Sequence, residues 1–240
     1  MGKLAGKVAI VTGGNRGIGK GTVRALAREG ANVTLAARDV EALHQTATEI
    51  DGTTLVVPTD VSVEADVDNL FTQTMERFGK LDILFNNAGA FDGGPITELS
   101  TEEWDHVMGV NLRGPFLCTR AAFRIMKEQG GGRIINIGSI SAQRPRMNTT
   151  PYSTSKFGLW GFTQAAALEG REHGIVCSCL HPGNVNIERR AASTEQMDQE
   201  PMMSCEEIAE TAVFMASQPP HVNILEAIML PVEQLYLGRG

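Results

Sequence analysis

Basic residues are in the minority in this chain of 240 residues, which carries 21 Lys and Arg against 28 Asp and Glu and has a net charge of −7. Nucleic-acid surfaces need clustered positive charge, so this balance and the pI near 5.3 argue against a nucleic-acid partner. No apolar run reaches the length that spans a membrane. Residues 1–4 lead directly into a predicted strand, which leaves no room for a signal peptide, and residues 237–240 are not a lipidation signal. We therefore expect no nucleic-acid and no membrane partner.

Cysteine is also scarce, with only Cys118, Cys177, Cys179 and Cys205. Cys177 and Cys179 alternate on a predicted strand and face the same way, but no matching Cys or His pair completes a metal site. A disulfide framework is typical of much smaller secreted chains. We expect four reduced thiols, no bound metal and a cytoplasmic location.

Long polar linkers, low-complexity tracts and internal repeats are absent as well, so we expect one domain over residues 1–240. Short β-branched runs alternate with longer amphipathic stretches, and the runs are largely apolar, which is typical of a parallel sheet covered on both faces. The expected fold is an α/β, Rossmann-type doubly wound parallel sheet. The predicted strands are Lys7–Thr12, Asn32–Ala37, Thr54–Thr59, Leu81–Asn86, Arg133–Gly138, Ile175–His181 and Ile224–Leu230. The predicted helices are Gly17–Glu29, Asp39–Ile50, Val63–Phe78, Thr101–Gln129, Pro151–His173 and Ser204–Ser217.

Three glycines, Gly13, Gly17 and Gly19, follow the first predicted strand and open a helix. Glycines here permit a tight turn and a close approach of the backbone, while the N–H groups of the helix N-terminus attract a pyrophosphate. Ligands on a doubly wound sheet bind at this carboxyl edge of the strands. A glycine-rich turn without a ligand is the alternative, and the strand–helix context favours a dinucleotide cofactor.

The choice between NADP and NAD depends on the end of the second predicted strand. Asp39 lies twenty residues after Gly19, where a carboxylate would bind the ribose of NAD, but it also fits as the N-cap of the next helix. The position facing the ribose is Ala37, Arg38 follows it, and Arg16 lies in the glycine loop. Two guanidinium groups and no carboxylate favour the 2′-phosphate of NADP. The alternative is that both arginines contact only solvent on an exposed rim, in which case the cofactor would be NAD(H).

Tyr152 and Lys156 are four residues apart on a predicted helix, so they lie on one face, one turn apart. A free phenol, with a pKa near 10, is a poor acid–base catalyst at neutral pH. A cation about 5 Å away, at an effective dielectric constant of about 20, favours the phenolate by about 3 kcal/mol and suits it to acid–base catalysis. Alone, the pair also fits a solvated helix face. Together with the glycine loop it indicates hydride transfer to or from a carbonyl.

In order and spacing these motifs resemble the short-chain dehydrogenase/reductase family, in its compact single-domain branch. The resemblance is nearly continuous from Gly6 to Gly183 and is carried by Thr12–Gly13-x3-Gly17-x-Gly19, Asp60–Val61, Asn86–Asn87–Ala88–Gly89, Asn111, Ser139, Tyr152-x3-Lys156 and Pro182–Gly183. It implies the catalytic set Asn111, Ser139, Tyr152 and Lys156. It implies cofactor contacts from Gly13, Asn15, Arg16, Gly17, Ile18, Gly19, Arg38, Asp60, Val61, Asn87, Ala88, Gly89, Tyr152, Lys156, Pro182, Gly183 and Val185.

The resemblance also implies what the main residues do. Tyr152 would donate the proton to the carbonyl oxygen, and Ser139 would hold that oxygen by a hydrogen bond. Lys156 would bind the nicotinamide ribose, and Asn111 would hold a water that links Lys156 to solvent. Asp60 would contact the adenine.

Arg16 and Arg38 stand where basic residues accompany NADP(H) in this family, which supports the direct prediction and leaves NAD(H) possible. The resemblance further implies a homodimer or homotetramer, in which the helices predicted at 101–129 and 151–173 pair across a twofold axis. Two features depart from the family. Ile187 stands where a Thr usually contacts the nicotinamide carboxamide, and the predicted strand 224–230 lacks the usual Gly–Gly tail.

The substrate walls are expected from residues 90–95, 141–151 and 187–203. Within them, an adaptable apolar pocket is indicated by Met147, Met197, Met202 and Met203. An anionic substrate is indicated instead by Arg144, Arg146, Arg189 and Arg190. Both sets also fit ordinary lid filling and a solvated loop, so the substrate is a small-molecule carbonyl or alcohol of open identity. Two other functions remain as alternatives. The first is the reduction of an activated C=C bond, and the spacing of Tyr152 and Lys156 argues against it. The second is a cofactor-binding regulator without turnover, whose usual sign would be the loss of this Tyr or Lys.

Overall fold

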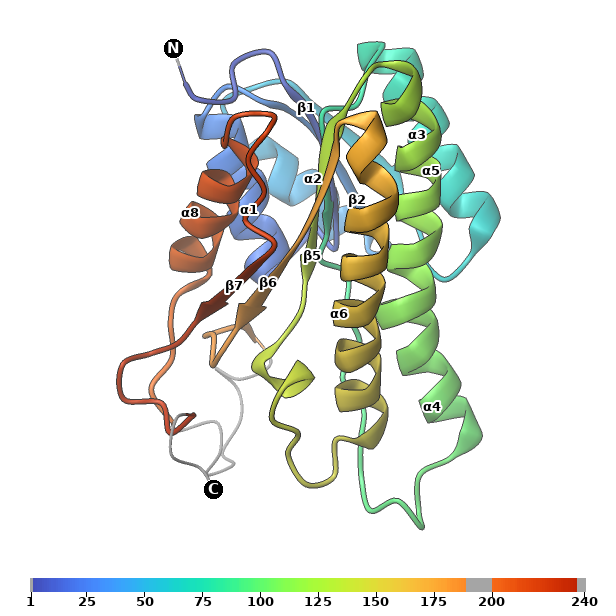
Figure 1. Cartoon of the computed structure of the whole chain (residues 1–240), viewed down its shortest axis with the longest axis vertical. Helices are drawn as coiled ribbons and strands as arrows, with labels where there is room; N and C mark the ends of the chain where they lie inside the picture. Colours follow the sequence, from blue (N-terminus) through green and yellow to red (C-terminus); the bar gives the residue numbers. More distant parts are fainter. Residues whose placement is uncertain (1, 189–199, 237–240) are drawn as a thin grey trace.

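The computed structural model describes residues 2–188 and 200–236, and they form one seven-stranded parallel sheet with helices on both faces (Figure 1). The sheet order is β3-β2-β1-β4-β5-β6-β7. The strands are β1 (Val8–Thr12), β2 (Asn32–Ala37), β3 (Thr54–Pro58), β4 (Ile83–Asn86), β5 (Gly132–Ile137), β6 (Ile175–Pro182) and β7 (Glu226–Met229). The longer helices are α1 (Gly17–Arg28), α2 (Val40–Thr48), α3 (Glu64–Phe78), α4 (Thr101–Met108), α5 (Gly114–Glu128), α6 (Thr150–Gly170) and α8 (Cys205–Ala216). The predicted doubly wound parallel sheet is confirmed.

The strands are apolar because both faces of the sheet are covered. Helices α1, α2 and α8 pack on one face, where Val23, Leu43 and Ile208 join one buried cluster (Figure 1). Helices α3, α5 and α6 pack on the other face and build a second cluster, which includes Leu70 and Leu117. All five residues of β1 are buried between the two layers, as expected for a strand in the middle of a parallel sheet.

The sheet changes its winding direction between β1 and β4. β1 pairs with β2 on one side and with β4 on the other, both in parallel. The loops after β1 and β4 therefore leave the same edge of the sheet in opposite directions and open a crevice between them, which is where ligands bind on such sheets.

The prediction of one continuous helix over residues 101–129 is wrong. The chain forms α4, then a π-helical turn at Gly109–Arg113, then α5. Pro115, the second residue of α5, has no N–H for the bond to the carbonyl four residues earlier, so the regular helical hydrogen bonding is interrupted at this point. Likewise the stretch 151–173 ends as an α-helix at Gly170 and continues as a 3₁₀ turn over Arg171–His173. The other predicted elements match the observed bounds to within two residues.

The last strand and the residues after it close the sheet edge in a way the sequence did not predict. β7 pairs in parallel with β6. The side chain of Gln234 then reaches back and accepts a hydrogen bond of 2.9 Å from the backbone N–H of Asn184. This contact holds residues 231–236 next to the carboxyl end of β6, on the side of the molecule where the glycine loop lies.

Within the described ranges, no helix is long and apolar enough to cross a membrane, and no cluster of His, Cys, Asp and Glu could hold a metal ion. All four cysteines are free thiols. Burial raises the pKa of the Cys118, Cys177 and Cys179 thiols to about 12 and that of Cys205 to about 11. These thiols are therefore protonated at neutral pH and poor nucleophiles.

Candidate active site

The glycine loop after β1 has the geometry of an anion cradle. Gly17 has φ of +52°, which favours glycine, and a Cβ on Gly19 would overlap the carbonyl oxygen of Gly13. Arg16, the N-cap residue of α1, provides no side-chain cap, and the first turn of α1 carries no acidic residue. No side chain of this local segment therefore caps the backbone N–H groups at the helix start, and the loop fits the pyrophosphate of a dinucleotide.

Hydrogen bonds from the loop after β4 hold the glycine loop in place. The Thr12 hydroxyl accepts hydrogen bonds from the backbone N–H groups of Asn87, at 3.0 Å, and Ala88, at 3.1 Å. The Asn87 amide donates to the carbonyls of Thr12, at 3.0 Å, and Gly13, at 3.2 Å. The Asn87 side chain therefore supports the cradle itself. The sequence motif includes Thr12, but the role of its hydroxyl as an acceptor for the loop after β4 was not predicted.

The remainder of the loop contacts α2 and the core. The Asn15 carbonyl accepts a hydrogen bond of 3.2 Å from the Thr46 hydroxyl, which is buried in α2. Ile18 packs, partly buried, against the cluster under α1. Arg16 is exposed, so its guanidinium is accessible to a ligand.

The end of β2 carries a guanidinium and no free carboxylate. Asp39 caps its own helix by accepting a hydrogen bond of 3.0 Å from the Ala42 N–H, as the N-cap alternative predicts. The Arg38 side chain is 67 % exposed, and its Nη1 lies 4.0 Å from Asp60 Oδ2. Partial burial raises the pKa of Asp60, but hydrogen bonds from Ser62 outweigh it and hold this pKa below the usual value. Asp60 is thus a carboxylate that faces the Arg38 side of the crevice.

Two more predicted cofactor residues, Val61 and Gly89, lie next to Gly114 and Asn111. Val61 is buried, and its side chain packs where a Cβ on Gly114 would stand. Gly89 passes over Asn111, since a Cβ there would lie 3.6 Å from the Asn111 Oδ1. The backbone of both segments reaches the carboxyl edge of the sheet.

The end of β5 brings the predicted catalytic residues together. Lys156, only 5 % exposed, donates a hydrogen bond of 2.7 Å to the Ile137 carbonyl. Its Nζ lies 5.6 Å from the centroid of the Tyr152 ring. Ser139, two residues beyond Ile137, is buried, and its Oγ accepts a hydrogen bond of 3.1 Å from the Ser141 N–H. The end of β5 therefore contacts the Lys156 cation at Ile137 and carries the Ser139 hydroxyl two residues further on.

Asn111 lies in the π-helical turn and has the partners that its burial requires. Its Oδ1 accepts from the Ala90 N–H at 2.7 Å, and its Nδ2 donates to the Ala90 carbonyl at 2.9 Å and to Ser155 Oγ at 3.1 Å. Ser155 in turn donates to the Tyr152 carbonyl at 2.7 Å. Pro115 supplies no N–H to the Asn111 carbonyl, so this carbonyl lacks the usual helical donor and suits the predicted water-holding role.

The carboxyl end of β6 forms the opposite wall. The chain leaves β6 at Pro182, and Gly183 donates a hydrogen bond of 2.7 Å to the Met229 carbonyl. Val185 is buried and pairs with Met203 in an isolated bridge. This pairing directs the following two residues towards the glycine loop.

Ile187 and Glu188 lie directly over the start of α1. Ile187 Cγ2 stands 3.3 Å from the position a Cβ on Gly17 would take. The backbone N–H of Gly17 donates a hydrogen bond of 3.1 Å to Glu188 Oε1. Sequence reasoning noted Ile187 but missed Glu188, because no local pattern links residues 171 positions apart.

A buried histidine, also missed, contacts the backbone of Ser139. His181 is fully buried, and its Nδ1 lies 3.2 Å from the Ser139 nitrogen and 2.9 Å from the Ser139 oxygen. Its Nε2 has no hydrogen-bond partner within the described residues and lies 3.5 Å from Glu226 Oε1. Burial lowers the pKa of His181, although the contact with Ser139 and the charge of Glu226 act in the opposite direction. The ring is therefore neutral at neutral pH.

This shift predicts a loss of stability in mild acid. A histidine whose folded pKa is below its unfolded value of about 6.5 contributes stability that is fully present above that pH and is lost as the pH falls below it. We expect the thermal unfolding midpoint to fall between neutral pH and the mildly acidic range, and the fall to be smaller in His181→Gln. His44→Gln, at an exposed position, is the matched control and should behave as the wild type. A wild-type midpoint that stays constant over this range would contradict the prediction.

The expected substrate walls are partly occupied by contacts within the chain. The Phe91 ring lies 4.8 Å from the Tyr152 ring and is 45 % exposed. Arg146 pairs with Glu200 at 3.6 Å, so its charge is not free for an anionic substrate. The Arg144 guanidinium stands 5.8 Å from the centroid of the Tyr236 ring. The wall beside Tyr152 is therefore aromatic.

The methionines of this region differ in their surroundings. Met203 is buried in the core, whereas Met147 is 88 % exposed. Arg189, Arg190 and Met197 lie outside the described residues. Met203 and Arg146 are thus engaged within the chain, and the choice between an apolar pocket and an anionic substrate stays open.

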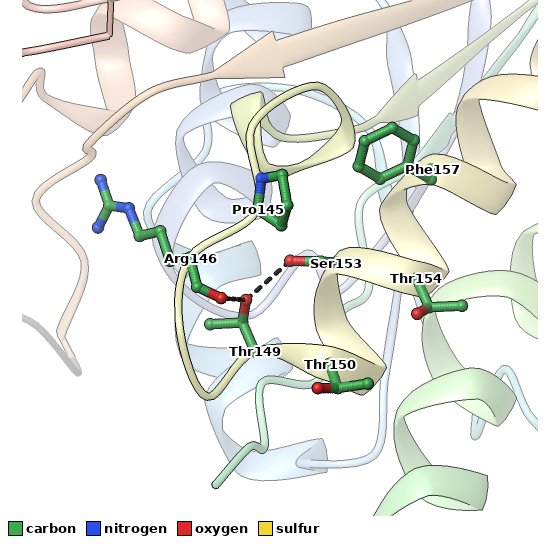
Figure 2. A pocket seen from close by; sticks show the side chains of 7 residues that line it. All are labelled: Pro145, Arg146, Thr149, Thr150, Ser153, Thr154 and Phe157. Atoms are coloured by element: carbon green, nitrogen blue, oxygen red, sulfur yellow. Dashed lines mark hydrogen bonds between the residues drawn. The ribbon is translucent and has the colours of Figure 1, made fainter. Parts of the chain in front are cut away.

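A pocket of about 390 Å³ lies beside the first turns of α6 (Figure 2). It is lined by Pro145, Arg146, Thr149, Thr150, Ser153, Thr154 and Phe157. The lining residues on α6 recur at positions i, i+3, i+4 and i+7 and form one face of the helix, whereas Tyr152 and Lys156 lie roughly half a turn round it. This pocket is therefore separate from the catalytic residues.

The crevice lies where the sheet changes its winding direction, between β1 and β4. It has the glycine loop on one side and Tyr152 beside Lys156 on the other, an arrangement that defines a class of dinucleotide-dependent oxidoreductases. The family model described as short chain dehydrogenase matches residues 7–198, and the chain belongs to this family. It is an NAD(P)-dependent oxidoreductase.

Known proteins agree with this assignment. An uncharacterized oxidoreductase of Staphylococcus aureus (strain USA300) is 37 % identical over 232 residues, which cover 95 % of this chain and 99 % of that protein. The solved 3-ketoacyl-(acyl-carrier-protein) reductase from Brucella melitensis, complexed with NADH, superposes with a TM-score of 0.89 at 31 % identity and covers 94 % of this chain and 97 % of its own. Levodione reductase superposes with a TM-score of 0.87 at 28 % identity, covering 94 % and 96 %.

Proposed function

We propose that this protein transfers a hydride between NADP(H) and a small carbonyl compound or secondary alcohol, with Tyr152 as the general acid and base. The observation that carries the proposal is the position of Lys156, whose Nζ is held by the Ile137 carbonyl at 2.7 Å and lies 5.6 Å from the Tyr152 ring centroid. A buried cation beside a phenol favours the phenolate and so eases proton transfer at the phenolic oxygen.

In the reduction, the bound cofactor supplies the hydride. Tyr152 donates its phenolic proton to the substrate oxygen, and the Ser139 hydroxyl donates a hydrogen bond to the same oxygen. Lys156 stabilises the phenolate that is left, and the Asn111 carbonyl holds a water through which the proton is replaced. In the oxidation the same groups act in reverse, with Tyr152 as the base.

The cofactor would lie across the crevice between the loops after β1 and β4. Its pyrophosphate would meet the start of α1 at Gly17, its adenine would contact Asp60, and its 2′-phosphate would be bound by Arg16 and Arg38. The exposed Arg38 and the use of Asp39 as a helix cap support NADP over NAD. The other predicted contacts, from Asn87 to Gly89 and from Pro182 to Val185, would come from backbone at the same edge.

Residues 1–240 are proposed to act as one catalytic domain in the cytoplasm, and as a homodimer or homotetramer. The oligomer is supported by large apolar side chains that stay exposed on α5 and α6, namely Phe116, Phe157 and Leu168. Such side chains on neighbouring helices are typical of a subunit interface. A monomeric mass at micromolar concentration in solution would contradict this part.

Two alternatives have specific support. An NAD(H)-linked enzyme is supported by the related reductase that was solved with NADH. A cofactor-binding regulator without turnover would fit Ile187, which packs on Gly17 where the family's Thr is expected. The presence of both Tyr152 and Lys156 in one site favours the enzyme over the regulator, and their spacing argues against C=C reduction.

The experiment is the oxidation of NADPH, with NADH in parallel, across aldehydes, simple ketones, β-ketoesters, quinones and keto-sugars. Turnover that favours NADPH is the expected result. Turnover that favours NADH would change the assigned cofactor to NAD(H) but would still support an oxidoreductase. Binding of NADPH without turnover on any class would favour the regulator and contradict the proposal.

A further inference from the structure

Glu188 occupies the place where the cradle would receive a phosphate. Its Oε1 accepts the hydrogen bond of the Gly17 N–H at 3.1 Å, and Gly17 is the first residue of α1. The N-cap residue, Arg16, gives this helix no side-chain cap. Glu188, which is 171 residues away in the sequence, therefore caps the start of α1, where the local sequence provides no cap.

The neighbouring residues hold Glu188 in this position. Val185 pairs with Met203, and the Asn186 N–H donates a hydrogen bond of 2.8 Å to the Met203 carbonyl. Ile187 then packs on Gly17, so the segment 185–188 lies on the glycine loop through both a polar and an apolar contact. This packing brings the exposed Glu188 side chain to the start of α1.

A carboxylate and a pyrophosphate cannot use the same N–H groups. Both are anions attracted by the positive end of the α1 dipole, and close approach of the two would bring like charges together. A dinucleotide that enters the cradle must therefore displace Glu188 from Gly17, and the free energy of the Glu188 contact is subtracted from that of cofactor binding.

We propose that Glu188 sets the affinity for the dinucleotide by acting as an internal competitor for its pyrophosphate at the start of α1. The inference rests on the proposed cofactor cradle but not on turnover.

The test is the affinity of purified wild type and Glu188→Gln for NADPH, NADH and ADP-ribose, measured by calorimetry without a carbonyl substrate. ADP-ribose has the pyrophosphate but no nicotinamide, so it reports on the cradle alone. We expect Glu188→Gln to bind all three about two- to fivefold more tightly, the range of an exposed charge at a helix end. Adenosine, which has no phosphate, should bind the two proteins equally.

Glu210→Gln is the matched control, because Glu210 is an exposed carboxylate that pairs with Arg28 at the opposite end of α1. It changes the net charge equally and should leave all affinities unchanged. Equal affinities of wild type and Glu188→Gln, or equal gains in both variants, would overturn the inference while leaving the cradle in place. Failure of wild type and variant to bind any of the three pyrophosphate-containing probes would overturn the cradle and the inference together.

Discussion

Replacing Tyr152 with Phe is expected to lower kcat for carbonyl reduction by about a hundred- to ten-thousandfold, the usual contribution of a general acid or base. The substitution removes only the phenolic O–H. The ring stays and keeps its contact with Phe91, whose centroid lies 4.8 Å away, so the fold should be unchanged and the affinity for NADPH should fall by much less than kcat. Steady-state kinetics on the best carbonyl substrate, with cofactor binding measured separately, checks both parts.

The chain has two tyrosines, which gives this prediction an internal control. Tyr236 hydrogen-bonds to Gln143 on the substrate side and has no lysine one turn away. Tyr236→Phe should keep kcat within a few-fold of the wild type. Full turnover in Tyr152→Phe would show that another group donates the proton.

Replacing both Arg16 and Arg38 with Ala is expected to lower kcat/KM for NADPH by about ten- to a hundredfold, because each charged hydrogen bond to a phosphate contributes about 1.5–3 kcal/mol at best and solvent screens it at an exposed rim. NADH has no 2′-phosphate, so its kcat/KM should change little. The measurement is the ratio of the two kcat/KM values in wild type and double variant.

Arg28→Ala serves as the control for this experiment. Arg28 is the last residue of α1, at the end of the helix opposite the glycine loop, and it pairs with Glu210. It should leave the NADPH/NADH ratio unchanged. A double variant with the wild-type ratio would place the selectivity elsewhere and would make NAD(H) the simpler assignment.

The sheet and most element bounds could be predicted because a parallel strand covered on both faces must be apolar along its whole length. β2, for example, was predicted at its observed bounds, Asn32–Ala37. The break in the helix at 109–113 was not predicted, since the periodicity of the flanking residues continues across it. Its signal was Pro115, which removes a backbone donor, and not any change in hydrophobic pattern.

The residues proposed to contact the cofactor and the substrate were predicted from short motifs, whereas the contacts that hold these residues in place were not. Lys156 and Tyr152 are neighbours on one helix, so their spacing alone brings them together. His181, Thr12 and Glu188 act through partners on other elements, and those contacts exist only once the sheet has formed. Asp39 was predicted in part. The sequence allowed it to be either a ribose ligand or the N-cap of the next helix, and the structure shows the cap.

The central claim is that this site moves a hydride between the cofactor and a carbonyl carbon. The most direct test uses NADPH that carries deuterium at the transferable position, with the best carbonyl of the panel, and analyses the product by mass spectrometry and NMR. The prediction is an alcohol that carries the deuterium on the former carbonyl carbon, formed by the wild type and formed about a hundred- to ten-thousandfold more slowly by Tyr152→Phe. An unlabelled alcohol, or oxidation of the cofactor without a reduced product, would contradict it.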